Sequence, residues 1–205
     1  MPPARWPKGT LRRSVVGLTD AQLRMVDTIE AAFIAAGYSI HTAAAAVVNA
    51  HAESGLNPLA VGDNGASIGL FQLHMYRGAG IGYTREQLIN PERNAAVLVA
   101  KEARSLAKVE AEAAAGASIA TLAGAFSRLV ERPSDAVGAA LARSALTVRL
   151  FPLGLSAPPT ATIAAARTAP ARSAAWWWWG AGGVVLLFGI GYGVYAYRRA
   201  YAPKT

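Results

Sequence analysis

Two neighbouring stretches organise this chain: VNAHAESGLNP at residues 48–58 and GASIGLFQL at residues 65–73. The first closes an alanine-rich helix and places one carboxylate, Glu53, near the helix end, before Gly55 breaks the helix. At such a position the stem of the side chain lies beside apolar neighbours, and burial raises a carboxyl pKa by disfavouring the charged form. A raised pKa suits a general acid that cleaves a glycosidic bond. The alternative interpretation of Glu53 is an ordinary solvated glutamate at a helix end.

The segment 55–82 differs from the helices around it, because it holds seven glycines together with Pro58, Asp63 and Asn64. This composition predicts a turn-rich insert that is irregular or contains a short hairpin. Its exposed backbone, together with Ser67 and Gln72, is suited to hydrogen bonding with a polar substrate.

Helical periodicity governs the remainder of residues 19–151 and predicts a mainly α domain of about five helices. The first helix starts with a capping box of Thr19 and Gln22 and ends before Gly37. Two further helices are expected over residues 42–54 and 90–115. Two more are expected to begin after the capping residues Ser118 and Ser134, and the last of them ends at Pro152.

The 205-residue chain has a formal net charge of +8, but the excess of basic residues is confined to its ends. Residues 1–13 carry four basic residues and residues 151–205 carry five, with no acidic residue in either segment. The part between them, 14–150, holds 11 basic and 12 acidic residues. Basic ends beside an apolar helix favour contact with anionic lipid over specific binding of nucleic acid.

We expect no metal and no other cofactor. The chain has no cysteine, which excludes a thiolate metal site. His51-Ala52-Glu53 is similar to part of the zinc motif of deaminases, but that motif also requires cysteines, which are missing here. The metalloprotease motif His-Glu-x-x-His is also absent. His41, His51 and His74 are interpreted as packing or surface residues.

The composition changes after the predicted domain. Residues 152–174 are rich in alanine and proline and predict a linker, and residues 175–199 predict a transmembrane helix. A bilayer is crossed by about 20 helical residues, which matches the uncharged stretch 176–197 with its tryptophans and tyrosines at the two ends. A buried hairpin helix of the domain is the alternative.

The two ends of the chain are expected to be basic tails, at residues 1–18 and 200–205. The first tail is followed by no apolar core of a secretory signal peptide. Basic residues directly after the membrane span favour a cytoplasmic C-terminus, with the domain on the other side. Gly189 and Gly193 form a Gly-x-x-x-Gly pattern that could pair two such helices.

The pair AESGLNP and GASIGLFQL resembles the double signature of lytic transglycosylases and phage tail lysozymes, over residues 20–150. This resemblance implies a lysozyme-like fold with Glu53 as the catalytic acid and Gln72 in the sugar-binding groove. NPERNA at residues 90–95 resembles the family segment whose asparagine supports the groove, here Asn94, and VERP at residues 130–133 resembles the tail-lysozyme ending. The same motifs imply substrate contacts by four further residues, Ser54, Ser67, Gly69 and Phe71.

The type of reaction stays open at the level of sequence. The Tyr-Asn motif typical of transglycosylases is absent where residues 125–128 read AFSR. A transglycosylase uses one glutamate twice and releases an anhydro-muramyl product, whereas a hydrolase commonly needs a second carboxylate. The candidates are Asp63, which also fits an ordinary turn, and Glu131, which also fits a salt-bridged helix end.

The resulting hypothesis is a membrane-anchored enzyme that cleaves the glycan strands of peptidoglycan, carried in a phage virion for penetration of the cell wall. A bacterial secretion or conjugation system is the cellular version of the same hypothesis. The alternative is an inactive glycan-binding or structural protein of a virion or membrane on a lysozyme-like scaffold. A holin-like pore is a third reading, and a single uncharged span argues against it.

Overall fold

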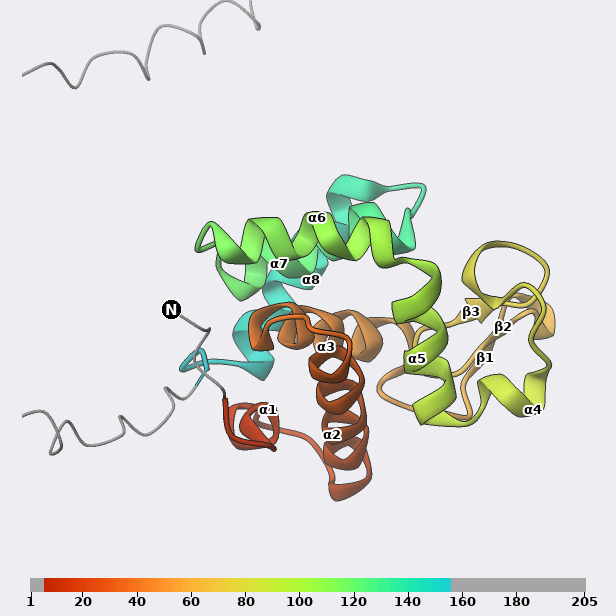
Figure 1. The fold of residues 1–205 in the computed structure, drawn as a ribbon, viewed down its shortest axis with the longest axis horizontal. Helices are drawn as coiled ribbons and strands as arrows, with labels where there is room; N and C mark the ends of the chain where they lie inside the picture. Colours follow the sequence, from red (N-terminus) through yellow and green to blue (C-terminus); the bar gives the residue numbers. More distant parts are fainter. Residues whose placement is uncertain (1–5, 156–205) are drawn as a thin grey trace, which may run out of the picture. The chain divides into compact units, whose positions relative to one another are not determined.

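The computed structural model describes residues 6–155, which form a helical domain with a small sheet at one end (Figure 1). This confirms the prediction of a mainly α domain with a short β insert. The helices are α1 (Thr10–Ser14), α2 (Asp20–Ala35), α3 (Ile40–Ser54), α4 (Arg85–Leu88), α5 (Pro91–Lys101), α6 (Ala103–Ala114), α7 (Ile119–Phe126) and α8 (Ala136–Leu150). Short 3₁₀ turns form η1 (Asp63–Gly65) and η2 (Gly78–Gly80), and a π-helical turn forms η3 (Ser127–Glu131).

The central helix of the domain is α3. Its residues 42–50 are all buried, and α2, α7 and α8 pack around it. The alanines at positions 43–46 have no accessible surface, and such small side chains let neighbouring helices approach closely. The helix ends at Gly55, whose positive φ of 64° suits glycine. Glu53 is therefore fixed in the last turn of a helix held on several sides.

The insert forms a three-stranded antiparallel sheet in the order β1 (Val61–Gly62), β2 (Ser67–Ile68) and β3 (Leu73–His74). Phe71, between β2 and β3, joins this sheet to the helices. Its ring centroid lies 6.5 Å from that of Phe33 in α2 and 6.3 Å from that of Phe126 in α7. This aromatic cluster holds the insert against the helical part of the domain.

Several predicted helix starts are confirmed, and two differ. Thr19 and Gln22 form the expected capping box of α2, and Ser118 caps α7. The helix expected from residue 42 begins at Ile40 instead. The last helix is capped by Asp135 rather than by Ser134, because the Asp135 carboxylate accepts the N–H of Gly138 at 2.8 Å.

The single helix expected over residues 90–115 is divided in two. The first part, α5, is capped by Asn90 as predicted, but the chain leaves helical geometry at Glu102, with φ −102° and ψ 19°. The Glu102 carboxylate is largely buried and pairs with Arg132 at 2.6 Å. A contact between distant residues accompanies this break, and no helix-breaking residue marks it in the sequence.

The N-terminal segment also differs from the expected tail at residues 1–18. Within it, α1 packs on the domain, and Leu11 is fully buried. The Glu30 carboxylate accepts the backbone N–H groups of Gly9 at 2.7 Å and Leu11 at 2.8 Å. The backbone N–H of Val16 donates to the carbonyl of Leu150 at 3.0 Å, so the segment closes on the end of α8.

The linker at 152–174 is described only up to residue 155, and the predicted transmembrane helix at 175–199 and tail at 200–205 lie outside the described residues. The Gly-x-x-x-Gly pattern of Gly189 and Gly193, expected to pair two such helices, lies there as well. Among the helices of residues 6–155, none has the length and apolar character needed to cross a bilayer.

Candidate active site

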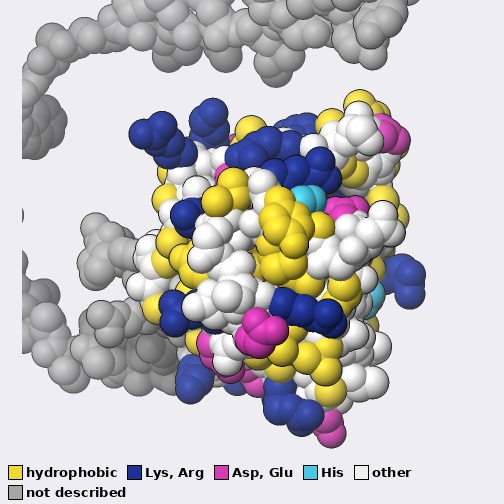
Figure 2. Space-filling view, turned by 90° about the vertical axis from the view of Figure 1, so that its right-hand side faces the viewer, with side chains coloured by type: hydrophobic (Ala, Val, Ile, Leu, Met, Phe, Trp, Pro, Cys, Tyr) yellow, Lys and Arg dark blue, Asp and Glu magenta, His cyan; other side chains and the backbone are white. Residues whose placement is uncertain are grey.

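A polar cleft of about 730 Å³ lies where the insert meets the helices, and its size is typical of a ligand site. Figure 2 looks onto the end of the domain that carries the sheet, where Lys and Arg side chains gather along the upper edge. Six of the residues proposed from the sequence line the cleft: Glu53, Asp63, Ser67, Phe71, Gln72 and Glu131.

Two glutamates that lie far apart in the sequence meet in this cleft. Glu53 comes from the last turn of α3 and Glu131 from the π-helical turn η3. Both contact Nη2 of Arg143 in α8, Glu53 through Oε1 at 2.6 Å and Glu131 through Oε2 at 3.0 Å. One guanidinium therefore bridges two carboxylates, with side-chain exposures of 29% for Glu53 and 12% for Glu131.

The guanidinium is itself held in place by a buried amide. Nε of Arg143 donates to Oδ1 of Asn49 at 3.0 Å. The Asn49 Nδ2 group donates to the carbonyls of Ala45 at 2.8 Å and Ala123 at 3.1 Å. Asn49 is fully buried, so α3, α7 and α8 together fix the position of Arg143.

The electrostatics of the cleft distinguish Glu131. Burial, together with the negative charge of Glu53, raises the pKa of Glu131 to about 7, against the opposing effect of Arg143. Oε1 of Glu131 is buried and has no hydrogen-bond partner among the described residues. With a pKa near 7, the Glu131 carboxyl is protonated in about half of the molecules at neutral pH, so the cleft holds an exchangeable proton beside Glu53.

The insert contributes Gln72 to the lining of the cleft. The residue has a positive φ of 45°, and its Nε2 group donates to the carbonyls of Ala60 at 3.2 Å and Gly69 at 3.0 Å. A side chain at Gly62 would collide with Gln72. The amide is therefore held rigidly at the cleft wall, where polar groups can orient a sugar.

The model of the phage tail lysozyme family matches residues 25–149, which include the two glutamates, their arginine and the insert. The chain belongs to the phage tail lysozyme family. No curated protein and no solved structure matches the chain significantly. Membership implies a glycoside hydrolase that degrades peptidoglycan, and it confirms the tail-lysozyme part of the resemblance.

Ser54 and Gly69, which were expected to contact substrate, and Asn94, which was expected to support the groove, are absent from the cleft lining. All three support the insert of this tail lysozyme domain. Asn94 is fully buried; its Nδ2 donates to the carbonyls of Ile68 at 3.0 Å and Leu88 at 2.9 Å, and its Oδ1 accepts the N–H of Phe71 at 3.1 Å. Any side chain at Gly69, where φ is +80°, would run into Asn94. Ser54 Oγ donates to the carbonyl of Leu70 at 2.8 Å.

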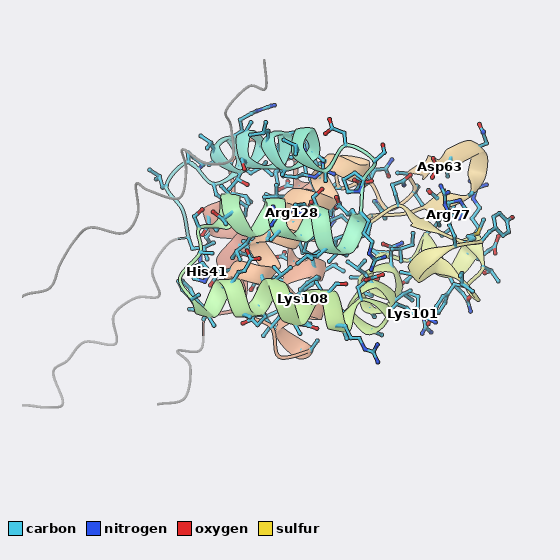
Figure 3. All side chains as sticks on the ribbon, turned by 90° about the horizontal axis from the view of Figure 1, so that it is seen from above. His41, Asp63, Arg77, Lys101, Lys108 and Arg128 are labelled. Carbon is cyan, nitrogen blue, oxygen red and sulfur yellow. The ribbon has the colours of Figure 1, made fainter. Side chains whose placement is uncertain are left out.

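The two candidate second carboxylates have different surroundings. Asp63 lies on the insert with 56% of its side chain exposed, accepts the hydroxyl of Ser67 at 2.6 Å and pairs with Arg77 at 3.9 Å. Figure 3 shows Asp63 and Arg77 together at the sheet end of the domain. Glu131, in contrast, forms an ion pair with Arg143, which also pairs with Glu53. The salt bridge expected for the motif of Glu131 is therefore present, and the residue also lines the cleft.

Sequence reasoning missed Arg143 and Asn49. The available signal was Asn49 itself, a polar side chain among small apolar residues of a buried helix, because a buried amide needs partners. Arg143 stands among small residues in α8 and gave no comparable signal. Of the histidines, only His74 lines the cleft, and residues 6–155 contain no cluster of three or more His, Asp and Glu side chains suited to a metal ion.

Proposed function

We propose that this tail lysozyme domain cleaves the glycan strands of peptidoglycan between N-acetylmuramic acid and N-acetylglucosamine, with Glu53 as the catalytic acid and base. The observation that carries this proposal is the convergence of Glu53 and Glu131 on Arg143 in the polar cleft. Cleavage of a glycoside requires a proton for the leaving oxygen and negative charge near the developing oxocarbenium ion. The two carboxylates can supply both.

The proposed reaction begins when the Glu53 carboxyl gives its proton to the glycosidic oxygen as the bond from that oxygen to the anomeric carbon breaks. The Glu53 carboxylate then takes a proton from the attacking group, either water or a hydroxyl of the sugar itself. Water gives a reducing end and the sugar hydroxyl gives an anhydro end. The proton balance on Glu53 is the same in both cases.

The test of this function is Glu53→Gln in the full chain, assayed on purified sacculi with mass spectrometry of the released muropeptides. The amide keeps the shape of the side chain but carries no transferable acid proton, so activity should fall at least about 100-fold. Glu92→Gln, on the exposed first turn of α5, is the matched control and should cleave normally. A folded Glu53→Gln protein with near-normal activity would refute the proposal.

We also propose that the enzyme is carried in a phage virion and held at a membrane by residues 176–197, so that it opens the cell wall locally. Family membership supports the first part. The second part is supported by the length and lack of charge of this stretch and by the basic residues that follow it.

A further inference from the structure

The arrangement around Arg143 has a consequence for how the carboxylates titrate. The Glu53 and Glu131 oxygens lie 2.6 and 3.0 Å from the same nitrogen, so they are no more than about 5.6 Å apart. Two carboxylates at such a distance repel each other, and a group this close changes a pKa by about one to three units. Groups coupled in this way lose their protons as a pair rather than independently.

The other charged groups near Glu131 do not replace Arg143. The elements that pack on η3 are α6, α7 and α8. The sequence of α7 has no titratable side chain, and at the start of α6 the carboxylate of Glu102 is paired with Arg132. His74, Asp63 and Arg77 line the same cleft from the insert. Arg143 is the only cation in residues 6–155 with an ion pair to either glutamate.

On this basis, we propose that Arg143 is a positioning residue that binds Glu53 and Glu131 into one titrating pair, which carries a single proton in the active enzyme. The inference rests on the proposed function of Glu53. Asn49 fixes Nε of Arg143 and so leaves Nη2 to face both carboxylates. A planar guanidinium can make all three contacts at once, whereas a lysine ammonium lacks this fork geometry.

The raised pKa of Glu131 agrees with a shared proton, since the pair then keeps one proton near neutral pH. Activity should follow a bell-shaped pH profile. It is lost at low pH, where both carboxyls are protonated, and at high pH, where neither is. The positive charge of Arg143 stabilises both ionised forms, so removing it should raise both apparent pKa values and move the bell to higher pH.

The first test compares pH profiles of sacculus cleavage for the full chain and for Arg143→Met and Arg143→Lys. The optimum should rise by about one pH unit in Arg143→Met and stay near its original position in Arg143→Lys, which keeps the charge. Arg93→Met, at an exposed arginine of α5 that does not line the cleft, is the control and should leave the optimum unchanged. An unchanged optimum in Arg143→Met, with only lower activity, would show a purely structural arginine and overturn the proposal.

The second test needs no activity and so separates this proposal from the function of Glu53. Carbon-13 NMR of labelled glutamate carboxyls follows the titration of Glu131 in the wild-type full chain and in Glu53→Gln. The Glu131 midpoint should fall by about one unit in the variant, because the neighbouring negative charge is gone. If the midpoint does not move, the two groups are not coupled. This test decides the matter even where Arg143→Met fails to fold.

Discussion

At the scale of single residues, the cleft separates two kinds of carboxylate. Glu53 and Glu131 are constrained by the buried guanidinium of Arg143, whose side chain is 12% exposed. Asp63 is tied to a neighbouring hydroxyl, that of Ser67, and stands largely in solvent. The constrained pair can hold and release a proton near neutral pH, whereas Asp63 can at most orient water or substrate from the insert.

This difference predicts the outcome of Asp63→Asn. The amide oxygen can still accept the Ser67 hydroxyl, so activity should fall less than about tenfold, which corresponds to about 1.4 kcal/mol of barrier. Sacculus cleavage with product analysis measures this, and Asp20→Asn, at an 85% exposed aspartate, serves as the control. A loss as deep as that of Glu53→Gln, with reducing ends among the products, would instead identify Asp63 as the base of a hydrolase.

At the scale of helices and strands, the sequence predicts what is determined locally. The capping box at Thr19 and Gln22, the start at Asn90 and the break at Gly55 follow from the geometry of neighbouring residues, and the structure has all three. Glu53, Gln72 and Glu131 could be assigned to the site because each lies in a short motif.

The missed features depend on contacts between residues far apart in the chain. The bend at Glu102 accompanies its pairing with Arg132, 30 residues later. The helix α1 is too short to reveal itself by periodicity and is held by the Glu30 carboxylate. Arg143 reaches Glu53 across 90 residues. No pattern within a window of sequence contains these partners.

The attachment of the insert to α5 gives a prediction at the same scale. Asn94→Leu keeps the branched shape and the number of heavy atoms of the side chain but leaves the Phe71 N–H and the carbonyls of Ile68 and Leu88 without their partner. Buried groups left unsatisfied cost about 1–3 kcal/mol each, so unfolding in urea should show a loss of at least about 2 kcal/mol.

The matched control for this substitution is Asn90→Ala, which removes only the cap of the same helix and should cost about 1 kcal/mol. The folded fraction of Asn94→Leu should also bind glycan more weakly, because Phe71 and Gln72 lose their fixed backbone. If Asn94→Leu is no less stable than Asn90→Ala, the amide does not hold the insert in the way that the hydrogen bonds indicate.

At the scale of the whole molecule, charge and hydrophobicity are divided along the chain. Residues 14–150 are nearly neutral, whereas residues 151–205 carry five basic residues and no acidic one. The described residues that line the cleft lie within residues 53–134. We propose membrane attachment as the task of the segment from residue 156 onward, because its uncharged stretch 176–197 has the length of a membrane span.

The anchor is tested by carbonate extraction of membranes from cells that express the full chain. The full chain should stay with the membrane, because a helix over 176–197 satisfies its backbone internally and buries apolar side chains in lipid. A variant truncated after Pro170 should be released. Leu187→Arg places a charge near the middle of the span at a cost of about 2.5–3.5 kcal/mol, so a larger fraction of this variant should be extracted. Release of the full chain as readily as the truncated one would contradict the anchor and leave the proposed chemistry of Glu53 untouched.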